Sequence, residues 1–207
     1  MINKFLNAKH WQLFTLMFGI PILLQIVVMI SMFTNIDSNG NPNQTGMLNM
    51  MKVFPIIMFL YIGLLFGWFW SIGIGLQKFI PTDIKMKIKK FKIFFFIPLT
   101  YILFLLIIIG TTFYGISSGS NAIGGIVGKM LFVVIPLHLF SMFCIFYLLY
   151  FVSKTIKTTE LKRNVTFSEF AGEFFMIWFF PIGIWFIQPR LNKIASEKST
   201  NGNNVYN

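Results

Sequence analysis

The side chain in this sequence best suited to acid–base chemistry is a histidine inside a long apolar run. His138 falls within the run 126–152, and histidine side chains titrate near neutral pH. An ionisable group at membrane depth often marks a proton relay or a transport path. The alternative is a neutral imidazole that hydrogen-bonds Gln25 or Ser141 across helices, and we favour it. Proton- or cation-coupled pumps normally also need buried carboxylates, and the long apolar runs contain no Asp or Glu.

The remaining reactive side chains form no pattern that is typical of an enzyme. The sequence has no histidine or cysteine cluster with metal-ligand spacing, no phosphate-binding glycine loop and no nucleophile motif. Glu169 and Glu173 lie four residues apart, so that they share one helix face and could pair with nearby cations or with the headgroup region. Their expected partners are Lys157, Lys162 and Arg163. We predict a non-enzymatic protein without metal or cofactor, and the enzymatic alternative is a lipid-modifying enzyme that uses Glu173 and a histidine.

Small residues recur at every fourth position of one apolar run and predict close helix packing. They are Gly63, Gly67, Ser71 and Gly75. Positions four apart form a stripe along one helix face, and small side chains let a second helix approach closely. The stripe serves either packing within the protein or an interface with a partner, which would be another membrane protein or a second copy.

The composition places these residues in an all-helical membrane protein. Hydrophobic residues make up 56% of the chain and charged residues 11%, whereas soluble domains carry about 25% charged residues. The runs that are long enough to cross a bilayer as helices are 11–33, 53–76, 93–116 and 126–152. They show no alternation of polarity, which argues against a membrane β-barrel. We predict one membrane domain over residues 1–195.

The links between these runs predict the orientation. The link 34–50 and the link 117–125 contain no Lys or Arg, whereas the links 77–92 and 154–172 are basic. By the positive-inside rule, the N-terminus and the two basic links are cytoplasmic. The net charge of +11 therefore reflects topology and contact with anionic headgroups, and we exclude nucleic acid as a partner.

The second link carries a dense group of cations. The lysines expected to contact anionic lipid are Lys85, Lys87, Lys89, Lys90 and Lys92. If a helix begins at Thr82 or Asp83, its apolar residues fall on one face, which predicts a short amphipathic helix in the membrane interface. The alternative is a plain charge cluster that sets the topology.

The aromatic run 174–187 is too short for a simple crossing. As a helix it covers about 21 Å, whereas the hydrocarbon core is about 30 Å thick. Pro181 and Gly183 interrupt it, and Trp178 and Trp185 are placed as interfacial anchors on either side. A crossing would also put the following cations outside. We predict a re-entrant hairpin or an interfacial helix, with a C-terminus on the cytoplasmic side; the alternative is a tilted fifth span.

These observations favour a scaffold function over transport. The tail 196–207 is polar and aperiodic, and we expect it to be disordered. The chain is predicted to be an accessory or scaffold subunit of a membrane complex, or an organiser of the inner leaflet. The alternative is a small oligomeric transporter or channel, with helices kinked at Pro21 and Pro136 and a re-entrant loop at 174–187.

Overall fold

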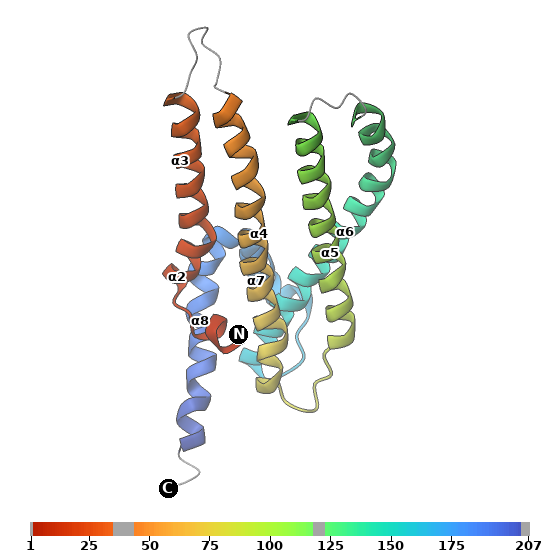
Figure 1. The fold of residues 1–207 in the computed structure, drawn as a ribbon. Coiled ribbons are helices and arrows are strands. Elements are labelled where there is room, and N and C mark those ends of the chain that lie inside the picture. The colour runs from red at the N-terminus through yellow and green to blue at the C-terminus, as the bar shows by residue number, and fades with distance from the viewer. Residues whose placement is uncertain (1, 35–43, 118–122, 204–207) are drawn as a thin grey trace.

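The computed structural model describes residues 2–34, 44–117 and 123–203 (Figure 1). In these ranges, every regular element is helical. The predicted all-helical class is therefore confirmed, and the described helices include four that are long and apolar enough to span a membrane. These candidate spans are His10–Ser31, Val53–Phe79, Ile88–Thr112 and Phe132–Leu161. Each of them overlaps one of the four apolar runs of the sequence, and the last begins and ends later than the run 126–152.

The first candidate span is assembled from three consecutive segments, and a short helix precedes it. The elements are α1 (Ile2–Asn7), α2 (His10–Phe14), the π-helical segment η1 (Thr15–Gly19) and α3 (Ile20–Thr34). The π-helical segment ends two residues before Pro21. A proline cannot donate to the carbonyl four residues earlier and its ring crowds that carbonyl, so the backbone widens there.

The other three candidate spans are continuous over most of their length. They are built from α4 (Gln44–Gly75) with the 3-10 segment η2 (Leu76–Phe79), α5 (Ile88–Ser117) and α6 (Ile123–Leu161). Figure 1 shows α3 beside α4 and α5 beside α6, with the two pairs converging toward α7 and α8. The buried core lies in this convergent half. Its largest fully buried side chains include Trp68, Phe91 and Leu148.

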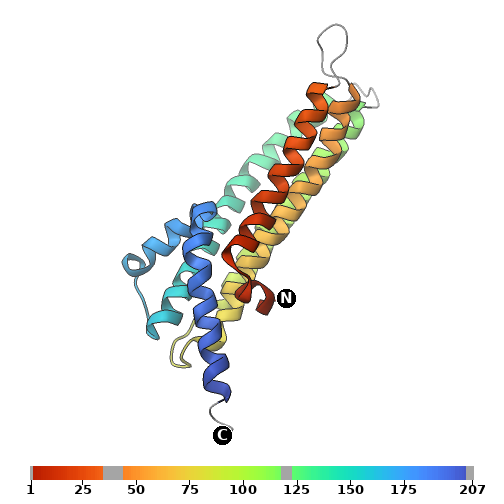
Figure 2. The same ribbon diagram turned by 90° about the vertical axis from the view of Figure 1, so that its left-hand side faces the viewer.

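The aromatic run near the C-terminus forms two helices and not one. The chain turns at Phe179, between α7 (Phe167–Trp178) and α8 (Phe180–Asn203), and α8 then leads back toward the end of the molecule near α1 (Figures 1 and 2). Phe179 has non-helical backbone angles, φ −88° and ψ 50°. Pro181 lies in the first turn of α8, where its missing N–H costs little. We call α7, Phe179 and α8 the C-terminal hairpin.

Two sequence predictions differ from the structure. No separate helix forms at Thr82, because residues 80–87 are a loop and α5 begins at Ile88. The predicted amphipathic helix is wrong there: Ile84 and Phe91 are buried within the protein and do not form an interfacial face. At the C-terminus, α8 stays helical to Asn203, well into the segment expected to be disordered, and residues 204–207 lie outside the described part.

Candidate functional site

Four charged side chains meet where α6, α7 and α8 pack together. Lys157 Nζ lies 3.1 Å from Glu173 Oε1, and Arg190 Nη2 lies 2.6 Å from the same oxygen. Arg190 also donates to both carboxylate oxygens of Glu160, from Nε at 2.7 Å and from Nη2 at 2.5 Å. Glu173 is only 5% exposed. We call Lys157, Glu160, Glu173 and Arg190 the ion network.

The charges of the ion network sum to zero, and charged side chains that are partly buried need such partners of opposite charge. Burial raises the pKa of Glu173, but hydrogen bonds from Arg190 and Lys157 outweigh burial and hold that pKa below its ordinary value. The two carboxylates raise the pKa of Arg190, so that its guanidinium stays charged. Two cations and two anions leave no net charge. A buried ion pair is stabilised only when its partners and hydrogen bonds are complete, as they are here.

A second ion pair begins α7 at the surface. Thr166 caps the helix together with Glu169, whose Oε2 accepts from the Thr166 amide at 2.7 Å. Arg163 Nη2 lies 2.5 Å from Glu169 Oε1. The Arg163 side chain and the two cap hydrogen bonds lower the pKa of Glu169 to about 2. The expected pairing of Glu169 and Glu173 with Arg163 and Lys157 is therefore confirmed, whereas Lys162 donates to a backbone carbonyl.

The sequence reading missed Glu160 and Arg190. A usable signal was the choice of cation, because Arg163 and Arg190 are the two arginines of a chain that otherwise uses lysine. Arginine presents a planar fork that binds carboxylates at two points, whereas lysine is a point charge. Both arginines bind glutamates in the structure.

A polar junction on the opposite side of α8 joins this helix to the N-terminus. Gln188 is buried; its Nε2 donates to the carbonyls of Phe5 and Ala8 at 2.8 Å each, and its Oε1 accepts from Trp68 Nε1 at 2.9 Å. One turn later, Asn192 Nδ2 donates to the Ala8 carbonyl at 3.1 Å. The last carbonyls of a helix have no partners within it, so these amides satisfy the end of α1.

The small-residue stripe of α4 is largely occupied by α1. A Cβ on Gly67 would lie 2.9 Å from the Phe5 ring, and one on Gly75 would lie 2.5 Å from Ile2 Cγ2. Ser71 is buried and donates to the Gly67 carbonyl. A Cβ on Gly63 would meet nothing within 4 Å. Of the four positions of the stripe, only Gly63 leaves room for a helix from outside the chain.

The polar side chains expected at membrane depth do not gather into one site. His138 Nδ1 lies 3.2 Å from Tyr101 Oη, so that within the described residues its partner is Tyr101 and neither Gln25 nor Ser141. Ser141 is buried one turn away in α6, and Gln25 is half-buried in α3. Tyr101 is 5% exposed, whereas His138 is on the outside of α6.

The expected interfacial residues lie on the outside of the protein. Trp178 packs edge-on against Phe146 and is 46% exposed; Trp185 packs against His10 and is 45% exposed. The lysines Lys85, Lys87, Lys89, Lys90 and Lys92 are all exposed. Gly183, in contrast, is buried where α7 and α8 touch.

Comparison with other proteins identifies no function for these residues. Comparison with protein-family models, with curated proteins and with solved structures gave no match. Among the described residues, no group of three or more His, Cys, Asp or Glu side chains is placed to hold a metal ion. The ion network and the Gln188 junction can therefore be interpreted only from their own contacts, which join α8 to α1, α4, α6 and α7.

Proposed function

We propose that this chain is a non-enzymatic, multi-pass membrane protein that acts as an accessory or scaffold subunit. Its N-terminus, the basic link 77–92 and the C-terminal hairpin would face the cytoplasm. The basic link 77–92 and the C-terminal part of α8, which carries Lys193, lie in the same half of the molecule (Figure 2). This arrangement supports the orientation by the positive-inside rule.

The C-terminal hairpin would enter the cytoplasmic half of the bilayer and turn back. Its tip, the turn between α7 and α8, lies beside the middle of the long helices, while α8 ends beyond them (Figure 2). Backbone groups in a bilayer must be satisfied internally, and the tip meets this demand: the Phe179 amide donates to the Phe175 carbonyl, and the Ile182 and Gly183 amides donate to the Phe179 carbonyl. Arg190 and Lys193 then remain on the cytoplasmic side, in keeping with the basic links.

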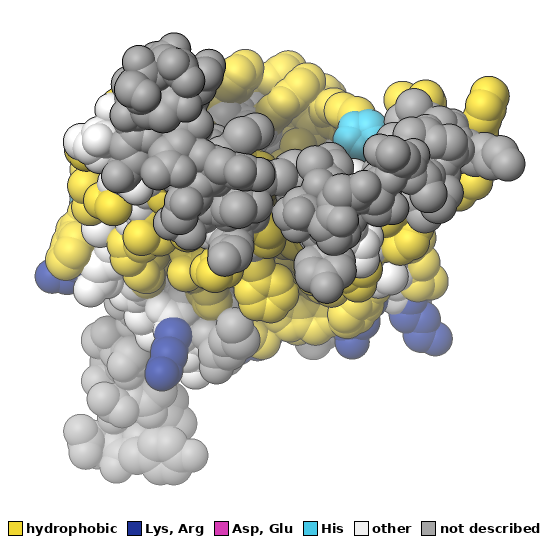
Figure 3. Space-filling view, turned by 45° about the horizontal axis from the view of Figure 1, so that its top comes forward, with side chains coloured by type: hydrophobic (Ala, Val, Ile, Leu, Met, Phe, Trp, Pro, Cys, Tyr) yellow, Lys and Arg dark blue, Asp and Glu magenta, His cyan; other side chains and the backbone are white. Residues whose placement is uncertain are grey.

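The observation that carries the scaffold role is an exposed aromatic edge on a hairpin that is held in place. The edge consists of Phe175, Trp178, Phe179, Ile182, Trp185 and Phe186. Phe179 is 62% exposed, Ile182 65% and Phe186 57%. The ion network and Gln188 hold α8 to four other helices, α1, α4, α6 and α7. Apolar side chains are exposed elsewhere on the molecule too, as Figure 3 shows for one face. The aromatic edge differs in lying on a hairpin that polar contacts hold in place, which suits a docking surface for another membrane protein.

Photo-crosslinking in cells tests the proposal at single positions. A photoreactive amino acid at Ile182 should capture a membrane protein that also co-purifies in stoichiometric amount in mild detergent. The same amino acid at Leu191, which is fully buried on α8, is the matched control and should capture nothing outside the chain. Ile182→Ser should release the co-purified subunit without unfolding the hairpin. Adducts with lipid alone at Ile182 would refute the subunit role and favour an organiser of the inner leaflet.

The transport alternative has one specific observation, the contact of His138 with Tyr101 at membrane depth. A histidine in that position could exchange protons. The experiment that separates the two functions is flux across reconstituted vesicles. Flux that His138→Ala abolishes would favour transport; a scaffold predicts no protein-dependent flux in either form.

A further inference from the structure

We propose that the groove between α5 and α6 is a binding site for one anionic phospholipid, with its headgroup at Lys92 and its tails along the groove. This inference rests on membrane insertion, but it is independent of the scaffold role and of the hairpin. The site lies on another side of the bundle and uses residues from α5 and α6 alone.

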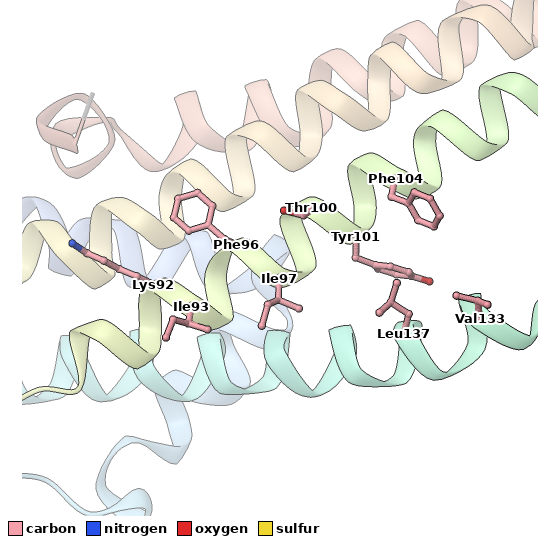
Figure 4. Close-up of a pocket in the computed structure, with 9 residues that line it drawn as sticks. All are labelled: Lys92, Ile93, Phe96, Ile97, Thr100, Tyr101, Phe104, Val133 and Leu137. Carbon is pink, nitrogen blue, oxygen red and sulfur yellow. The ribbon is translucent and has the colours of Figure 1, made fainter. Parts of the chain in front are cut away.

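The groove combines an apolar wall with a cation at one end. Its volume is about 790 Å³, and its lining residues are Lys92, Ile93, Phe96, Ile97, Thr100, Tyr101, Phe104, Val133 and Leu137. Figure 4 shows Lys92 at one end, Phe104 at the other, and Val133 and Leu137 from α6 facing the Tyr101 ring. A lysine at the end of an apolar groove matches an amphiphile with an anionic head.

The dimensions fit a lipid within one leaflet. From Lys92 to Phe104, α5 rises about 18 Å, and one leaflet contributes about 15 Å of hydrocarbon. The groove is therefore long enough for the acyl tails of one lipid within one leaflet.

The charge around Lys92 selects the sign of the headgroup. Lys89 and Lys92 are one turn apart at the start of α5 and are both exposed, and within the described residues no carboxylate forms an ion pair with either of them. Lys90, on another side of α5, lies over the rings of Phe94 and Tyr147, so its charge faces away from this end. The cations beside the groove are thus uncompensated by the protein. A phosphate group would neutralise them.

A contact between Tyr101 on α5 and His138 on α6 fixes the inner wall of the groove, and bound acyl tails would leave this contact intact. Tyr101 is buried, and its hydroxyl contacts His138 Nδ1 at 3.2 Å. The outer wall is exposed: Ile93 is 61% exposed and Val133 is 63% exposed. A tail that lies on these side chains covers apolar surface without moving the helices.

Native mass spectrometry of the purified protein tests the headgroup. The wild-type protein should retain one molecule of added phosphatidylglycerol more tightly than it retains a molecule of added phosphatidylcholine. One lysine beside anionic lipid is worth about 1 kcal/mol, so Lys92→Gln should weaken phosphatidylglycerol binding about five-fold and leave phosphatidylcholine unchanged. Lys87→Gln removes the same charge from the same link, outside the groove, and should have little effect. Equal losses in the two variants would overturn the proposal, because they would indicate a diffuse charge effect.

Photoreactive lipid tests the position of the tails directly. Phosphatidylglycerol with a diazirine in its acyl chain should label the segment 93–104 and residues near Val133, in vesicles of phosphatidylcholine. Val133→Phe adds bulk at the groove wall and should reduce that labelling several-fold. Labelling spread evenly over all four candidate spans would overturn the proposal. Retention of the protein in membranes after an alkaline wash establishes insertion separately, so that a failure of this site is distinguishable from a failure of the membrane assignment.

Discussion

Replacing Gly183 with alanine should separate the two arms of the C-terminal hairpin. A Cβ at this position would lie 1.8 Å from the Met176 carbonyl oxygen and 2.5 Å from its carbon. Both atoms are backbone, so no side chain can rotate away, and α7 and α8 must move apart by more than 1 Å. Overpacking in a core costs typically 1–3 kcal/mol, and a gap of about 1 Å forfeits up to half of each van der Waals contact along the interface. We expect Gly183→Ala to destabilise the protein by about 3 kcal/mol.

The same chemical change on the neighbouring helix provides the control. Gly172 lies in the middle of α7, where an added Cβ would meet nothing within 4 Å. Alanine is preferred over glycine inside helices by about 0.5–1 kcal/mol. Gly172→Ala should therefore stabilise the hairpin slightly. The two variants differ in packing alone.

The single cysteine supplies the assay. Cys144 is fully buried, so that a thiol-reactive dye should label it only after the bundle opens. In a thermal ramp in mild detergent, about 3 kcal/mol corresponds to a midpoint lowered by about 6–12 °C for a chain of this size. Gly172→Ala should raise the midpoint by about 1–4 °C. A midpoint of the Gly183→Ala variant within about 2 °C of the wild-type midpoint corresponds to less than about 1 kcal/mol on the same scale. Such a result would refute the close approach of α7 and α8.

Three further predictions concern the polar contacts of α8 and its neighbours. Glu173→Gln should lower the same midpoint by about 5–10 °C, because it removes the negative charge that two partly buried cations share; an unchanged midpoint would argue against the ion network. The folded-state pKa values of Glu169 and Glu173 are below the ordinary value of 4.5, so their stabilisation is present above that pH and is lost as the pH falls through the folded values. Helicity followed by circular dichroism should therefore fall below about pH 4, and Glu169→Gln should remove the component that persists toward pH 2. Gln188→Leu should cost about 1–3 kcal/mol and change the fluorescence of Trp68, which loses its acceptor, whereas Asn192→Ala should leave that fluorescence unchanged.

The helical layout was predictable because hydropathy is a local property. Each apolar run was longer than a bilayer needs and was bounded by polar links, and the four candidate spans follow these runs. The turn in the C-terminal run was also predictable, since its length fell short and Pro181 with Gly183 interrupted it. The structure places the turn at Phe179, and Pro181 falls in the next helix.

The long-range contacts were not predictable, because periodicity describes a face and does not identify what covers it. The apolar pattern of Ile84 and Phe91 is the same whether that face meets lipid or protein, and protein covers it here. The stripe with Gly67 indicated close approach, but nothing in the sequence identified α1 as the helix that approaches. The hydrogen bonds of Gln188 to the carbonyls of Phe5 and Ala8 join residues about 180 positions apart, near the two ends of the chain.

The two faces of α8 support different parts of the proposal. Gly183, Ile184, Ile187, Gln188 and Leu191 follow helical spacing and are all buried. Trp185 and Phe186 fall between them and are exposed, next to the exposed tip of α7. One face is therefore committed to the protein's own helices, and a partner or a lipid can reach the hairpin only through the other. If the hairpin is a docking surface, substitutions on the exposed face should release the partner without lowering stability, and substitutions on the buried face should lower stability first.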